Sequence, residues 1–163
     1  MSGSLAARIA RALLGGIWFA GWFFAAFPAA LLWLCGASLV PPPGANRLLG
    51  AALIAAAHVA LVALVAQFLR DGAGTQLPFD PPTRVVARGI YARVRNPMYA
   101  TYVAIACGEA VLYRSGPLAA YALALAALFH AYVVRVEEPR LQTRFGVDYD
   151  RYCEATGRWW PRR

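Results

Sequence analysis

Long apolar stretches separated by short charged segments dominate the pattern of the chain. No charged residue occurs from residue 12 to residue 46, and residues 12–34 and 48–69 are almost entirely apolar. Each is long enough to cross a hydrocarbon core of about 30 Å as a helix that rises about 1.5 Å per residue. Two shorter apolar stretches follow at 97–113 and 117–134. The pattern predicts an all-α, polytopic membrane bundle with about four transmembrane segments.

Turn-forming residues indicate where these helices bend and end. Pro28 is expected to bend the first helix, and Pro41, Pro42 and Pro43 stop it from continuing. The connection Arg114, Ser115 and Gly116 is so short that the last two segments must form a tight antiparallel hairpin. Ala52, Ala56 and Ala60 recur at every fourth position. They predict a smooth face on which a neighbouring helix can approach closely.

Composition supports a bilayer rather than water as the solvent. Of 163 residues, 60% are apolar and the mean hydropathy is +0.49, which is too apolar for an ordinary soluble domain. The three cysteines cannot form a complete disulfide set and have no CxxC spacing. A secreted disulfide scaffold and a structural zinc site are therefore both disfavoured, and we expect no metal site.

The basic residues indicate how the segments are oriented. All 16 are arginines, and with four crossings only Arg47 and Arg114 fall on one side of the membrane. The positive-inside rule then places the N-terminus, the loop from Arg70 to Asn96 and the C-terminal tail in the cytoplasm. An integral protein of the inner or cell membrane is predicted, if the source is bacterial. Because topology accounts for the net charge of +8, no nucleic-acid partner is expected.

One acidic residue lies inside an apolar segment. Glu109 is about 18 Å along the third helix from Pro97 if that helix is regular, which places it near the middle of the membrane. A carboxylate at that depth is expensive and is either paired or functional. A hydrogen bond to His58, on the second segment, is the simpler interpretation, and a proton route or substrate contact is the alternative.

Two polar segments meet the same predicted membrane face. Pro97 suits the first turn of a helix, so the third segment delivers Arg95, Asn96 and Tyr99 to the surface. After the hairpin, Leu141, Phe145, Tyr149 and Tyr152 repeat at intervals of three and four, interrupted at Gly146. They predict an amphipathic tail on the membrane surface, with Trp159 and Trp160 among the headgroups. Taken alone, such a tail is typical of an interfacial anchor that binds anionic lipid through its arginines.

The motifs in these segments resemble those of a known enzyme family. The first comprises Gly89, Tyr91, Arg95, Asn96, Pro97 and Tyr99; the second comprises Glu137, Glu138, Leu141, Phe145, Gly146, Tyr149 and Tyr152; the third comprises Arg158, Trp159 and Pro161. In this order around a helical hairpin, they resemble the isoprenylcysteine carboxyl methyltransferase and phospholipid methyltransferase family of integral membrane enzymes. The resemblance covers residues 84–161.

The resemblance implies S-adenosylmethionine as cofactor and assigns residues to it. The cofactor-binding set that it implies is Tyr91, Arg95, Asn96, Tyr99, Glu137 and Glu138. Arg158 and Arg135 are candidates for binding an anionic group of the substrate. The family usually has His where this chain has Asn96; Asn keeps the hydrogen-bonding capacity but not the acid or base chemistry. Methyl transfer from a sulfonium requires alignment more than side-chain chemistry, so no catalytic acid, base or nucleophile is expected.

The sequence therefore predicts one membrane methyltransferase domain over residues 1–163, with a cytoplasmic loop and the tail forming the site. The chain has no GxGxxG motif after a strand, so no Rossmann domain is expected. The methyl acceptor is expected to be lipophilic or small and apolar, with a carboxylate, amine, thiol or phenol as the acceptor group. Membrane lipids are expected partners, and no obligate protein partner is evident. A non-catalytic binding or scaffold protein of the same fold, or a small transporter, are the alternatives.

Overall fold

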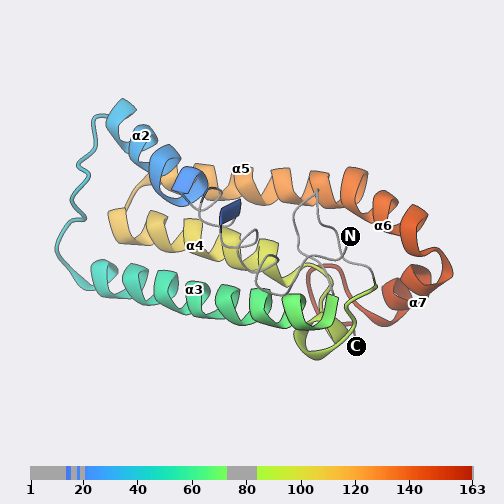
Figure 1. Cartoon of the computed structure of the whole chain (residues 1–163). Coiled ribbons are helices and arrows are strands. Elements are labelled where there is room, and N and C mark those ends of the chain that lie inside the picture. Colours follow the sequence, from blue (N-terminus) through green and yellow to red (C-terminus); the bar gives the residue numbers. More distant parts are fainter. Residues whose placement is uncertain (1–13, 16–17, 19–20, 73–83, 163) are drawn as a thin grey trace. The chain divides into compact units, whose positions relative to one another are not determined.

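The computed structural model describes all residues except 1–13, 16–17, 19–20, 73–83 and 163. The described residues form helices joined by turns, without a β-sheet (Figure 1). They divide into two compact units. Among the described residues, one unit contains 14–15, 63–72, 84–98 and 130–162, and the other contains 18, 21–62 and 99–129. The all-helical fold class is thus confirmed. Of the predicted loop from Arg70 to Asn96, residues 73–83 lie outside the described residues, and residues 70–72 belong to the end of a helix.

Apolar helices build the unit of residues 18–62 and 99–129. They are a π-helical turn η1 (Trp22–Ala26), α2 (Phe27–Leu34) and parts of α3 (Ala45–Gly72), α4 (Pro97–Tyr113) and α5 (Gly116–Tyr132). Ala106 on α4 and Ala122, Leu125 and Phe129 on α5 form its buried core. Tyr99, Tyr102 and Phe129 pack their rings together at centroid distances of 4.9–6.2 Å. The short loop at Arg114 joins α4 to α5 as the sequence predicted, with Arg114 at φ 50°.

Two glycines let α3 and α4 approach closely within this unit. A Cβ atom on Gly50 would lie 2.5 Å from the backbone nitrogen of Leu112, and one on Gly108 would lie 2.7 Å from Cγ1 of Ile54. Ala52, Ala56 and Ala60 are exposed, so the face that they form does not pack within the described part of this chain, and its use between two copies of the chain stays a prediction. This crossing requires glycine rather than alanine, because the two helix backbones are too close for a Cβ atom.

The predicted pairing of Glu109 with His58 is wrong. The His58 side chain is exposed, and its Nδ1 lies 2.8 Å from the carbonyl oxygen of Ile54, one turn earlier on the same helix. Glu109 is 7% exposed, and its Oε2 has no hydrogen-bond partner among the described residues. The two side chains therefore do not meet, because His58 bonds its own helix.

Short helical elements build much of the other unit, and the chain changes direction between the last two of them. Its elements include the 3-10 turn η2 (Gly89–Ala92), the π-helical turn η3 (Val133–Glu137), α6 (Glu138–Phe145) and α7 (Val147–Ala155). Gly146 separates α6 from α7 at φ 55°, a backbone conformation that favours glycine. This break agrees with the sequence prediction.

The tyrosines of α7, which the sequence predicts to face a bilayer, are turned toward the protein instead, and contact of the rest of the tail with a membrane stays a prediction. Tyr149 is 5% exposed, and the hydroxyl of Tyr152 donates a 2.7 Å hydrogen bond to the carbonyl oxygen of Tyr91. Val94 and Gly157 form a parallel β-bridge. Because the turn at Gly146 reverses the chain, the aromatic side of α7 is buried by the protein. Trp160 stays 82% exposed.

Two long helices have the length and composition of membrane spans. Within the described residues these are Ala45–Asp71 and Gly116–Phe145; Trp22–Leu34 is a shorter apolar helix, and α4 has 17 residues. The predicted segments 48–69 and 117–134 fall within the two long helices, and α4 covers 97–113. Four complete crossings stay a prediction, since part of the first segment lies outside the described residues.

The Gly50 contact predicts a position-specific cost. Gly50→Ala should lower the free energy of unfolding by about 1 to 3 kcal/mol, because the new methyl group overlaps the Leu112 backbone. The midpoint temperature of unfolding should fall accordingly. Gly116→Ala meets no atom within 4 Å and is the matched control. The midpoint temperature of each variant is measured by heating samples in detergent and then determining the remaining folded protein by size-exclusion chromatography. Equal midpoints for the two variants would contradict the close contact of α3 and α4.

Candidate functional site

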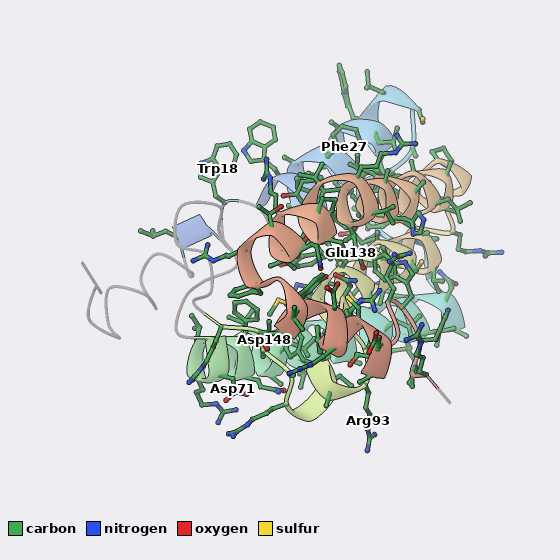
Figure 2. All side chains as sticks on the ribbon, turned by 90° about the vertical axis from the view of Figure 1, so that its right-hand side faces the viewer. Trp18, Phe27, Asp71, Arg93, Glu138 and Asp148 are labelled. Carbon is green, nitrogen blue, oxygen red and sulfur yellow. The ribbon has the colours of Figure 1, made fainter. Side chains whose placement is uncertain are left out.

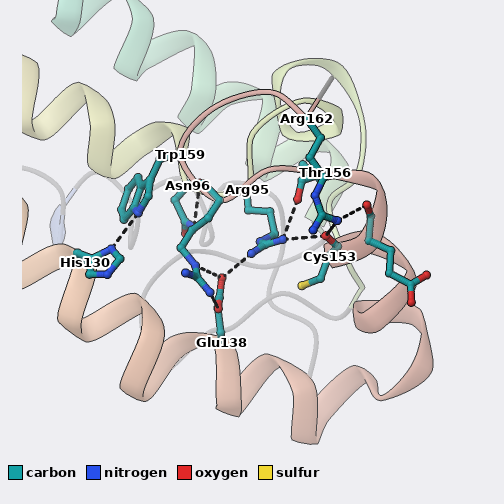
Figure 3. A network of polar contacts seen from close by, with 10 residues as sticks. Arg95, Asn96, His130, Glu138, Cys153, Thr156, Trp159 and Arg162 are labelled. Atoms are coloured by element: carbon teal, nitrogen blue, oxygen red, sulfur yellow. Dashed lines mark hydrogen bonds and ion pairs between the residues drawn. The ribbon is translucent and has the colours of Figure 1, made fainter.

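The segment Val94–Asn96 is fixed to the C-terminal tail by its backbone and by Asn96. The amide of Arg95 donates to the carbonyl oxygen of Gly157 at 2.9 Å. Asn96 is 8% exposed, and its Nδ2 donates to the carbonyl oxygen of Arg158 at 3.3 Å. Two stretches about sixty residues apart in sequence therefore lie side by side (Figure 3).

The Arg95 guanidinium uses three of its five N–H donors in hydrogen bonds inside the protein. Its Nη1 donates to the carbonyl oxygens of Cys153 at 3.0 Å and Thr156 at 2.7 Å, and its Nη2 donates to Oε1 of Glu138 at 3.0 Å. The side chain is 11% exposed. Its Nε is buried and has no acceptor among the described residues. Arg95 thus joins the end of α7 to the start of α6, and its buried Nε–H group is a donor that these contacts do not use.

Glu138 is the carboxylate on which two guanidinium groups converge. Its Oε1 accepts from Nη2 of Arg95 at 3.0 Å and from Nε of Arg158 at 2.9 Å, and its Oε2 accepts from Nη2 of Arg158 at 2.7 Å (Figure 3). The Arg158 contact is the bidentate arrangement that matches a planar guanidinium to a carboxylate. The hydrogen bond to Glu138 raises the pKa of Arg158, so this cation stays charged.

This cluster has a charge and a hydrogen-bonding capacity that a ligand could use. Two arginines around one glutamate leave one net positive charge. A carboxylate offers about four lone-pair directions, and the contacts above fill two on Oε1 and one on Oε2. Arg158, whose side chain is 35% exposed, keeps Nη1 without a described partner. The cluster therefore offers an anion-binding donor beside one remaining acceptor.

The other residues predicted for the site differ in burial and in the contacts that they make. Tyr91 is 4% exposed, and its backbone carbonyl oxygen accepts a hydrogen bond from the Tyr152 hydroxyl. Burial raises the pKa of Tyr152. Glu137 is half-buried and ends η3 directly before Glu138. Tyr99 belongs to the other unit, where it packs on Tyr102 and Phe129. Arg135 is exposed, and no described polar contact joins it to Glu138.

Several contacts that shape the cluster were not predicted from sequence. Thr156 is 1% exposed and presents its carbonyl oxygen to Arg95. Trp159 donates from Nε1 to Nδ1 of His130 at 3.0 Å, where the sequence suggested a headgroup anchor. The glycine at position 157 is the sequence signal that could have indicated this arrangement, because a Cβ atom there would overlap the carbonyl oxygen of Trp160 and the tail turns tightly at this point.

The contacts of Arg95 predict that its loss releases the tail. In Arg95→Met, the Cys153 and Thr156 carbonyl oxygens lose their charged donor and Glu138 loses one of its two cations. Amide hydrogen exchange across residues 149–157 should become at least tenfold faster, since hydrogen bonds to charged groups contribute about 1.5 to 3 kcal/mol.

Arg93→Met is the matched control for this measurement. The Arg93 side chain is exposed and points away from the helices (Figure 2). Exchange in Arg93→Met should equal that of the unmodified protein. Unchanged exchange in Arg95→Met would show that Arg95 does not hold the tail.

Comparison with known proteins identifies the family to which this arrangement belongs. A sequence model described as phospholipid methyltransferase matches residues 45–148, more than half of the chain. The match runs from the first residue of α3 into α7 and includes Arg95 and Glu138 but not Arg158. No curated protein sequence matches the chain. The chain belongs to the phospholipid methyltransferase family, and it is therefore a membrane methyltransferase that uses S-adenosylmethionine and acts on a lipid-type acceptor.

Proposed function

We propose that this single domain transfers a methyl group from S-adenosylmethionine to a lipophilic acceptor bearing an anionic group, at the cytoplasmic face of the membrane. The observation that carries the proposal is the convergence of Arg95 and Arg158 on Glu138, at 3.0 Å and 2.7 Å. It brings together side chains from both motif segments and from the tail. The family match supports methyl transfer as the reaction, and the cluster is the site that we propose for it.

The residues present fit the amino-acid and nucleoside parts of the cofactor. A zwitterion with ribose hydroxyls needs an anion-binding donor and an acceptor close together, and the Glu138 cluster offers both. Arg95 Nε is a buried donor without an acceptor among the described residues, as a ligand-binding group would be before it binds. Tyr91, Asn96 and Glu137, from the same unit, complete the proposed cofactor-binding set, and Tyr99, which belongs to the other unit, stays a prediction from sequence.

The protein's part in the reaction is to position and to exclude water. When bound, S-adenosylmethionine supplies a methyl group activated by a positively charged sulfur. Arg95 and Asn96 hold the tail against the entrance to α4, which fixes Glu138 and Arg158 in place. Alignment of this kind can lower a barrier by about 7 to 11 kcal/mol. No side chain is assigned as a catalytic acid, base or nucleophile.

The acceptor's anionic group, a carboxylate or a lipid phosphate, is assigned to Arg158. Two of its nitrogens already hold Glu138, and Nη1 remains for a further anion. The net positive charge of the cluster attracts such a group from the membrane surface. Arg135 is exposed on the turn before Glu138 and is a second candidate for this contact. The methyl-accepting group on the same lipophilic molecule is a carboxylate, amine, thiol or phenol.

Binding of S-adenosylhomocysteine tests the proposed site. Calorimetric titration of the full-length protein in detergent should give micromolar affinity. Glu138→Gln should weaken binding at least tenfold, because the neutral amide removes the charge shared by both arginines. Glu154→Gln changes an exposed glutamate on α7 and should bind as the unmodified protein does.

A second measurement separates an enzyme from a binding protein. Radiolabelled S-adenosylmethionine is incubated with the protein and a bacterial total lipid extract, and label in the organic phase is counted. Label transfer that is lost in Glu138→Gln supports the proposal, whereas tight binding without transfer supports the scaffold alternative. No binding of S-adenosylhomocysteine at millimolar concentration would overturn the cofactor site.

A further inference from the structure

Each of three successive tail residues forms a hydrogen bond with a residue elsewhere in the same unit, besides the contact of the Arg158 guanidinium with Glu138. The carbonyl oxygen of Gly157 accepts from the Arg95 amide, and that of Arg158 accepts from Asn96. The third is Trp159, whose indole Nε1 donates to Nδ1 of His130 at 3.0 Å (Figure 3). Two of these contacts come from the proposed cofactor motif. The third comes from α5, outside every motif used so far.

The His130 contact and the Glu138 contact hold the side chains of two adjacent tail residues. Glu138 holds the Arg158 guanidinium through two nitrogens, while His130 holds the next residue, Trp159. Both side chains belong to one continuous helical stretch, Gly116–Phe145. The position of Arg158 therefore depends on how His130 and Glu138 are spaced around that helix.

The π-helical turn between them sets this spacing. In a regular α-helix, two residues eight positions apart, as His130 and Glu138 are, would point about 80° apart around the axis at about 100° per residue. A single π turn absorbs one additional residue, so the pair is spaced like residues seven apart, about 20° from alignment. The turn η3 (Val133–Glu137) lies between the two residues. It brings His130 and Glu138 to the same side of the helix, where the tail meets both.

We infer that His130 is a positioning residue that fixes Arg158 through Trp159, an inference that rests on the proposed function. An indole N–H can only donate, so Nδ1 of His130 must be the acceptor and the ring carries its proton on Nε2. When this contact is lost, Trp159 loses the one hydrogen bond that its side chain makes among the described residues, and Arg158 is left with its contacts to Asn96 and Glu138. The bidentate geometry on Glu138 then loosens, and the carboxylate loses its orientation toward the cofactor.

Four variants test the inference in the full-length protein in detergent. His130→Leu and Trp159→Phe each remove one partner of the hydrogen bond. His130→Asn keeps an acceptor near the position of Nδ1. His58→Leu is the matched control, because the other histidine bonds only its own helix at Ile54.

The readouts are the dissociation constant of S-adenosylhomocysteine and the nitrogen-15 resonances of the Trp159 indole and of Arg158 Nε–H. We expect His130→Leu and Trp159→Phe to weaken binding about fivefold, the effect of one hydrogen bond, and to expose Arg158 Nε–H to rapid solvent exchange. The double variant should be no weaker than either single variant, because both remove the same contact. His130→Asn should stay within about twofold of the unmodified protein, as should His58→Leu.

Two outcomes would overturn the inference. One is a His130→Leu protein that binds normally and keeps the Arg158 Nε–H resonance. The other is a His130→Asn protein as weak as His130→Leu, which would mean that the imidazole only fills space. If the unmodified protein fails to bind S-adenosylhomocysteine, the proposed function fails; loss of the Arg158 resonance in Trp159→Phe still decides whether the contact positions Arg158.

Discussion

The carboxylate of Glu138 is the constraint on which the rest of the site depends. It is 16% exposed and accepts hydrogen bonds from two guanidinium groups, so all three charged groups are partly desolvated. Such a cluster persists only when its geometry is good, since removing one partner leaves the others unpaired. Arg95 meets this requirement with two carbonyl oxygens of the tail, and Arg158 meets it with a bidentate contact. The fold of residues 84–98 and 130–162 can be understood as the means of assembling this cluster.

Two prolines account for the irregular turns in the helices. Each π turn ends two residues before a proline: η1 before Pro28, and η3 before Pro139. A proline ring would clash with the carbonyl group of the residue four positions earlier in a regular helix, and those residues, Phe24 and Arg135, lie inside the π turns. The wider turn relieves the clash and lets the helix continue. In the second case it also sets the orientation of Glu138 relative to His130.

Much of this arrangement follows from the sequence because its signals are local. Apolar length, the Pro97 start, the short connection at Arg114 and the Gly146 break each depend on a few neighbouring residues, and the helices have these features. The proximity of Arg95 to the glutamates followed from motif resemblance. Its detail did not: which glutamate takes both arginines depends on the π turn, whose extra residue rotates everything after it by about 100°.

The predicted contacts that the described residues do not make share a physical cause, which is that they join separate segments. Ala52, Ala56 and Ala60 form a plausible face, but the closest approach is made by Gly50 and Gly108, and no periodicity reports backbone distance. His58 and Glu109 have complementary chemistry, yet the Ile54 carbonyl oxygen satisfies His58 locally. Local partners compete with distant ones, and sequence alone does not indicate which will be chosen.

Hydrogen exchange of the full-length protein, with and without S-adenosylhomocysteine, tests most directly whether the two segments form one binding site. The account predicts that the ligand slows amide exchange in both residues 88–98 and residues 137–158, while exchange in residues 45–56 of α3 stays unchanged. Protection of only one of the two segments, or protection spread evenly over all helices, would contradict it.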